Sequence, residues 1–256
     1  LIVITACMLL FCLWLPSSSF KLNKDAFGFP IQWIPKNPRW QNYVDIWTQI
    51  PLLTFVKNTV KITVVVTLLQ LFTSSFAAYA FAKMQFKGKN ALFLGYIATI
   101  AVPWQAYMVP QFMMMSSWHL NNTHLAIMCL QAFSAFGVFL MKQFYEGVPT
   151  ELCEAARIDG LSEYGIWWHI MLPLSLPALS TLTIFTFVNT WNDFLGPLIY
   201  LTKTELKTIQ IGLRMFITQY SAEYGLIMAA SVVALIPVLI VFLGAIVGVI
   251  VVALVV

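Results

Sequence analysis

The chain has 256 residues, of which 60% are hydrophobic and only 9% are charged, and its mean hydropathy is +0.84. A soluble domain is about half apolar and about a quarter charged, so this composition excludes a soluble fold and indicates that lipid covers much of the surface. The net charge of +4 is spread along the chain without a basic cluster. Nothing in it therefore suggests nucleic acid as a partner.

The chain opens with an apolar run, Leu1–Leu15. This run is shorter than the ~20 residues that a helix needs to cross the hydrocarbon core. It has no small-residue cleavage site of the kind that ends a signal peptide. We therefore expect the sequence to begin partway through a first membrane helix. Residues 16–51 contain five prolines, which predicts an extended extramembrane loop.

Further apolar runs predict the remaining membrane spans. They are Lys61–Ala82, Ala91–Met115, His124–Gln143, Leu174–Leu201 and Tyr224 to near the C-terminus. The whole pattern predicts an all-α fold, a polytopic membrane helical bundle of six transmembrane helices that forms one domain over residues 1–256. Counts of Lys and Arg leave the orientation open, although three lysines within residues 83–89 favour that side as cytoplasmic.

Four of the ten acidic residues lie close together in the connection between the fourth and fifth spans. The local pattern predicts two short helices: Thr150 caps the first, Gly160 forms a left-handed turn, and Ser162 caps a second that ends near Pro173. Such a helix pair is shaped for docking into a groove of a partner. The alternative is an amphipathic connection that rests on its own bundle or on lipid headgroups, and the pattern alone favours this second interpretation.

The same connection resembles the signature loop of permeases from binding-protein-dependent ABC importers. That motif is Glu-Ala-Ala, three residues, Gly, nine residues, then Ile-x-Leu-Pro. All seven positions occur here with every spacing kept: Glu154, Ala155, Ala156, Gly160, Ile170, Leu172 and Pro173.

The resemblance implies that residues 149–173 form a coupling region, which lies in the cytoplasm and seats in a cleft of an ATPase. By that analogy Glu154 pairs with a basic residue of the ATPase and Gly160 sets the turn. Arg157 and Asp159 supply further charge on the same helix.

The resemblance extends to residues 186–201 and 222–243, which are similar to the fifth and sixth helices of carbohydrate-importer permeases. Over residues 58–237 the pattern is similar to the smaller, six-span permease of the maltose-transporter type. This implies a type I ABC importer permease fold in a bacterial or archaeal cytoplasmic (inner) membrane, crossing it several times. It also implies these partners: a second, homologous permease subunit, two cytoplasmic ATPase subunits, an extracytoplasmic sugar-binding protein and a sugar. The binding protein would contact residues 202–223.

We expect no catalysis and no cofactor in this chain, because no G-x-x-x-x-G-K-S/T loop occurs in it. ATP and Mg would belong to the partner ATPase. The four cysteines and three histidines lack metal-ligand spacing, so we expect no metal site. We interpret the cysteines as packing residues.

Polar groups inside two spans predict a substrate path, because such groups are costly in lipid and tend to face a water-filled route. Amides and carboxylates suit sugar hydroxyls, and aromatic faces suit the ring C–H groups. In the third span, Pro103 and Pro110 predict a bend or local unwinding. The candidates from the two spans are Trp104, Gln105, Tyr107, Gln111, Asn189, Trp191, Asn192 and Asp193. The same residue types also join helices or anchor them at the interface, and that alternative stays open.

Other functions compete with sugar import. A glycerol-3-phosphate permease would want Arg or Lys in its cavity, and the sequence offers no clear intramembrane candidate, so a neutral sugar is favoured. A permease for glycerol-3-phosphate or a polyol is the alternative. A secondary transporter would show inverted repeats with matched broken helices. A membrane-embedded enzyme would carry a motif such as H-E-x-x-H or G-x-S-x-G. We find neither signature in the sequence.

Overall fold

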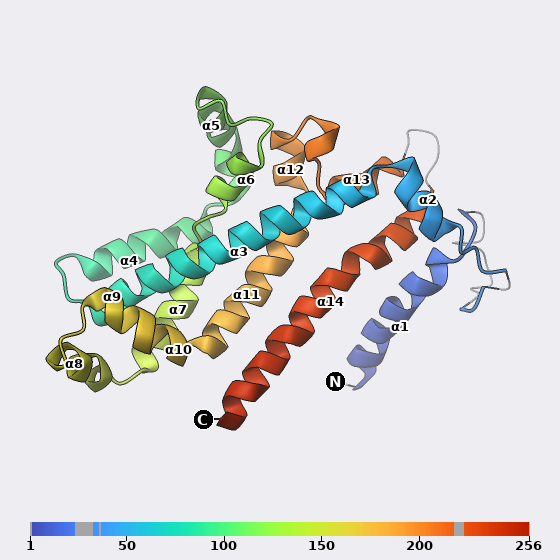
Figure 1. The fold of residues 1–256 in the computed structure, drawn as a ribbon. Helices are drawn as coiled ribbons and strands as arrows, with labels where there is room; N and C mark the ends of the chain where they lie inside the picture. Colours follow the sequence, from blue (N-terminus) through green and yellow to red (C-terminus); the bar gives the residue numbers. More distant parts are fainter. Residues whose placement is uncertain (1, 24–32, 36, 218–222, 256) are drawn as a thin grey trace. The chain divides into compact units, whose positions relative to one another are not determined.

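The computed structural model describes residues 2–23, 33–35, 37–217 and 223–255, and these form helices joined by short connections (Figure 1). The predicted all-α class is confirmed. The α-helices are α1 (Ile2–Ser19), α2 (Asn42–Gln49), α3 (Leu52–Lys83), α4 (Lys89–Ala98), α5 (Trp104–Ser117), α6 (His124–Leu130), α7 (Ala135–Gly147), α8 (Thr150–Ile158), α9 (Glu163–Ile166), α10 (Leu172–Leu174), α11 (Leu176–Trp191), α12 (Leu195–Tyr200), α13 (Ile209–Met215) and α14 (Tyr224–Val255). Short 3₁₀ turns occupy Thr99–Ala101 and Thr204–Leu206, and Trp167–Met171 is a π-helix.

Most of the predicted spans correspond to long or broken helices. Two helices, α3 and α14, are each long and apolar enough to cross a membrane alone. Within the described residues the number rises to as many as five if each of three bent pairs is one span: α4 with α5 at 100°, α6 with α7 at 43°, and α9–α10 with α11 at 80°. The remaining predicted span, Leu1–Leu15, coincides with α1. Because charges are costly in hydrocarbon, we place α8, the turn after it and the start of α9, which together carry four acidic residues, outside the bilayer.

Proline causes the sharpest of these bends. Val102 and Pro103, between the 3₁₀ turn and α5, both have extended backbone, with ψ angles of 112° and 139°. Proline lacks an N–H and disfavours a helical conformation in the residue before it. The predicted bend in the third span is therefore confirmed at Pro103. Pro110, by contrast, lies inside α5 without ending it.

The prediction of an extended loop over residues 16–51 is wrong in part. Pro16 lies inside α1, which continues to Ser19, and α2 forms before α3. The buried side-chain amide of Asn42, the first residue of α2, donates to the carbonyls of Ser19 (2.8 Å) and Lys21 (3.0 Å). These bonds satisfy acceptors at the end of α1 and hold the start of α2 against it.

The chain divides into two compact units, residues 1–60 with 192–239, and residues 61–191 with 240–256. In the second unit, α3, α7, α8, α9 and α11 share a buried core that includes Tyr79, Met141, Tyr145, Cys153, Ile166 and Trp167. In the first unit, Gly212 of α13 packs on the Phe55 ring of α3, where a larger residue would collide with the ring. The two candidate sites described below lie one in each unit.

Candidate functional site

The segment 149–173 forms the predicted helix–turn–helix. Gly160 has a φ of +85°, and a side chain there would meet nothing within 4 Å, so the left-handed backbone rather than close packing requires glycine. The Ser162 hydroxyl accepts a hydrogen bond from the Gly165 N–H at 3.3 Å, which confirms it as a cap. The predicted cap at Thr150 is wrong. Thr150 is already the first helical residue, and Pro149, with its fixed φ of −56°, precedes the helix without a side-chain cap.

Helix α8 has one buried face and one exposed face. Cys153 and Ala156 are 0% and 4% exposed and belong to the core of the second unit. Glu154 and Ala155 lie on the exposed face, and Ile158 beside them is 86% exposed. The buried face rests on the chain's own bundle, as the amphipathic interpretation predicts. The opposite face presents an acid, a small residue and an apolar residue together, which suits a protein partner.

An ion pair holds α8 to α9. Arg157 donates from Nε to Glu163 Oε1 at 2.7 Å and from Nη2 to Oε2 at 3.3 Å. The hydroxyl of Tyr79, on α3, donates to the same Oε2 at 2.5 Å. The hydrogen bond from Arg157, followed by that from Tyr79, holds the pKa of the Glu163 carboxyl below its ordinary value. Arg157 is thus engaged within the segment, whereas Asp159 ends α8 as an exposed residue.

The end of the motif joins this segment to α11. Ile170 and Leu172 are half-buried and pack against the core of the second unit, whereas Pro173 is exposed. The chain bends by 80° immediately afterwards, at buried Ser175, whose hydroxyl donates to the Leu172 carbonyl at 2.9 Å. Figure 1 shows α8, α9 and the C-terminal end of α3 lying together. Residues 163–174 therefore link α8 to the start of α11.

The predicted substrate-path residues of the second unit make several contacts of their own. On α5, the Trp104 indole N–H donates to Gln111 Oε1 at 2.8 Å, while Gln105 and Tyr107 are exposed. On α11, Asn189 is exposed. Trp191 is only 1% exposed, and its ring stacks on that of Phe187 at a centroid distance of 5.6 Å. Trp191 thus presents no open face in this unit.

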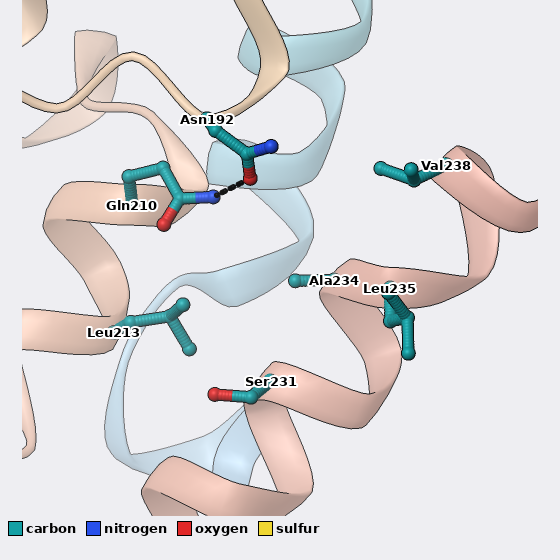
Figure 2. A pocket seen from close by; sticks show the side chains of 7 residues that line it. All are labelled: Asn192, Gln210, Leu213, Ser231, Ala234, Leu235 and Val238. Atoms are coloured by element: carbon teal, nitrogen blue, oxygen red, sulfur yellow. Dashed lines mark hydrogen bonds between the residues drawn. The ribbon is translucent and has the colours of Figure 1, made fainter. Parts of the chain in front are cut away.

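A pocket lies in the first unit between α13 and α14 (Figure 2). Its volume is about 230 Å³. The residues that line it are Asn192, Gln210, Leu213, Ser231, Ala234, Leu235 and Val238. Asn192 Oδ1 accepts a hydrogen bond from Gln210 Nε2 at 3.2 Å, and Figure 2 shows this amide pair on one side with the α14 side chains opposite. None of these lining residues is ionisable, so the pocket combines amides and a hydroxyl with apolar walls.

Of the pocket residues, the sequence predicted only Asn192. Gln210 lies in a short amphipathic helix and Ser231 in a continuous apolar run, so neither gives a spacing signal. Asp193, predicted beside Asn192, accepts a hydrogen bond from the Gly196 N–H at 3.1 Å, in the first turn of α12. In the described part of the chain, no group of three or more His, Cys, Asp or Glu side chains could hold a metal ion.

Known proteins resemble this chain over most of its length. Residues 70–256 match the family described as binding-protein-dependent transport system inner membrane component. The arabinooligosaccharides transport system permease protein AraQ of Halalkalibacterium halodurans is 36% identical over 229 residues, 89% of this chain and 81% of that protein. The lactose transport system permease protein LacG of Rhizobium radiobacter is 36% identical over 203 residues, 79% and 74% of the two chains.

A solved structure shares the fold. It is a crystal structure of a bacterial ABC transporter involved in the import of the acidic polysaccharide alginate, with a TM-score of 0.83 and 23% identity over 94% of this chain and 90% of that one. This likeness confirms the predicted type I ABC importer permease fold. On the family match and the relatives together, the chain belongs to the inner-membrane components of binding-protein-dependent transport systems.

Proposed function

We propose that this chain is the membrane-spanning permease subunit of an ATP-driven importer for a neutral sugar or oligosaccharide. The observation that carries the proposal is the exposed face of α8, on which Glu154, Ala155 and Ile158 stand beside a left-handed Gly160 turn. An isoleucine that is 86% exposed is better placed in a cleft of a partner protein than in water, and the acid beside it can pair there with a basic residue. The arabinooligosaccharide and lactose permeases among the relatives support the sugar.

The complex would contain a second, homologous permease, two cytoplasmic ATPase subunits and an extracytoplasmic sugar-binding protein, in a bacterial or archaeal cytoplasmic membrane. ATP and Mg would bind to the ATPase subunits, and this chain would carry no cofactor. Closure of the ATPase pair would draw the α8 helices together and favour the outward-facing state of the permease pair. The binding protein would favour the same state from the other side.

The pocket of the first unit supports a neutral ligand. Asn192 and Gln210 offer amide donors and acceptors, Ser231 offers a hydroxyl, and the remaining lining residues are apolar. A phosphorylated substrate such as glycerol-3-phosphate would want a bidentate arginine or a lysine, and none lines this pocket. Membership of a transport-subunit family also argues against a membrane-embedded enzyme and against a secondary transporter.

The test is ATP hydrolysis and uptake by the reconstituted complex, with wild type compared with Glu154→Ala in the presence and absence of loaded binding protein. The sugars to try are arabinooligosaccharides and lactose. Loss of a charge-assisted hydrogen bond costs about 1.5–3 kcal/mol, so stimulated hydrolysis should fall about tenfold or more. Glu151→Ala, an exposed acid on the same helix outside the motif, is the matched control and should change hydrolysis less than about twofold. Equal behaviour of the two variants would remove the main support for the proposal.

A further inference from the structure

The C-terminal turn of α3 is bonded to both ends of the α8 segment. Lys83, the last residue of α3, donates from Nζ to the Val148 carbonyl at 2.5 Å, just before α8. Tyr79 lies one turn earlier on the same face of α3. Its hydroxyl donates to the carboxylate of Glu163, the first residue of α9. The two contacts bridge 65 and 84 residues of sequence. They fix the segment to α3 at its entry and at its exit.

Burial of Tyr79 and Lys83 makes their hydrogen bonds to the α8 segment costly to break. Tyr79 is 2% exposed and Lys83 is 8% exposed, although both carry polar groups near the end of a membrane helix. A buried polar group without a hydrogen bond is costly, so each side chain strongly favours the conformation in which its bond to the segment is made. Glu163 in turn holds Arg157 of α8 through two hydrogen bonds. A continuous path of hydrogen bonds thus runs from α8 through Glu163 into α3.

We propose that Tyr79 and Glu163, with Arg157, are positioning residues that make α8 and α3 move as one body, so that the work of the ATPase reaches the membrane helices. This inference rests on the proposed function. The path includes none of Glu154, Ala155 and Ile158, which form the exposed face of α8, and none of the pocket residues, so its loss leaves ATPase docking and sugar binding intact. Without it, α8 tilts on its Gly160 turn and ATP is hydrolysed with less transport.

The experiment measures sugar uptake per ATP hydrolysed in proteoliposomes that contain the whole complex, with lactose and arabinooligosaccharides as the probes. Tyr79→Phe keeps the buried ring and removes only the hydroxyl. It should leave copurification with the ATPase and basal hydrolysis within about twofold of wild type, and should lower uptake per ATP about fivefold to tenfold. Tyr164→Phe is the matched control, because Tyr164 neighbours Glu163, is 68% exposed and retains its stacking on Phe76 as phenylalanine.

Glu163→Gln provides a second, independent variant, because this half-exposed side chain can lose its charge without opening the core. It should lower uptake per ATP as Tyr79→Phe does. The proposal is overturned if Glu163→Gln keeps the wild-type ratio, or if Tyr164→Phe lowers the ratio as much as Tyr79→Phe. The proposed function fails separately, if the wild-type complex shows no hydrolysis stimulated by loaded binding protein or if Glu154→Ala retains it.

Discussion

Arg157 and Glu163 face each other across the Gly160 turn and form a two-point ion pair, Nε to Oε1 at 2.7 Å and Nη2 to Oε2 at 3.3 Å. Their side chains are 36% and 38% exposed, so solvent screens the pair and its contribution to stability is modest. Its geometry matters more than its energy, because a bidentate arginine–carboxylate pair fixes the angle between two short helices.

The ion pair predicts how stability depends on pH. The pKa of Glu163 is lowered in the folded protein, first by the hydrogen bond from Arg157 and then by that from Tyr79. The ionised carboxylate therefore stabilises the fold, and this contribution is fully present above the unfolded pKa of about 4.3. It is lost as the pH falls through the lower pKa of the folded protein. At about pH 6–7, well above that unfolded value, Glu163→Gln should therefore have a lower melting temperature than wild type. The difference between the two melting temperatures should shrink as the pH is lowered. Thermal unfolding in detergent measures it, and a gap that widens towards acid would contradict the assignment.

Helix α7 offers a matched pair of glycines for a packing prediction. A side chain at Gly137 would collide with Ser74 of α3 and would also crowd Leu182 of α11, whereas one at Gly147 would meet nothing within 4 Å. Small residues let membrane helices approach closely. Gly137→Ala should therefore destabilise the protein by about 1–3 kcal/mol, as overpacked cores do. Gly147→Ala should be neutral or stabilising by up to about 1 kcal/mol. Similar melting temperatures for the two variants would show that α3 and α7 can separate without cost.

The break between α6 and α7 predicts a role for an amide in the middle of α3. Gln70 donates from Nε2 to the Gln131 carbonyl at 2.7 Å and accepts from the Thr186 hydroxyl at 2.9 Å. Thr73 donates to the Ala132 carbonyl at 2.8 Å. Carbonyls at a helix break need such partners inside a membrane. Gln70→Leu should lower the free energy of unfolding by about 1–2 kcal/mol, since it removes two interhelical bonds.

The control for this prediction is Gln105→Leu, which replaces an exposed amide on α5 and should leave stability within about 0.5 kcal/mol. Both variants are compared by thermal unfolding in the same detergent. If Gln70→Leu is as stable as Gln105→Leu, the break is held by packing alone.

Local sequence patterns predicted the helix–turn–helix of residues 149–173 and the break at Pro103 well. Gly160, Ser162 and Pro103 each act within a few residues of themselves, through a left-handed turn, a cap and a helix stop. Such features depend on backbone chemistry that a short window contains. The wrong cap at Thr150 shows the limit of this argument, because a proline immediately before it starts the helix instead.

The unpredicted features depend on partners far away in the sequence. The break near Gln131 has no proline and is bonded from Gln70, 61 residues earlier. The contact from Tyr79 to Glu163 spans 84 residues. The pocket residue Ser231 lies in an apolar helix, where one serine resembles any other small packing residue. Neither periodicity nor spacing in one chain reports which of these groups meet.

The pocket of the first unit predicts a change in apparent substrate affinity. The side-chain amides of Asn192 and Gln210 line it, and Gln210 Nε2 donates a hydrogen bond to Asn192 Oδ1 at 3.2 Å. Removal of either amide would leave a bound sugar with fewer hydrogen-bonding partners. Asn192→Ala should raise the KM for uptake about tenfold, the equivalent of one hydrogen bond to a neutral ligand. Basal ATP hydrolysis should stay unchanged, because neither residue belongs to the α8 segment. Gln105→Ala, an amide that does not line the pocket, is the control. A KM that rises with Gln105→Ala but not with Asn192→Ala would move the substrate path to α5.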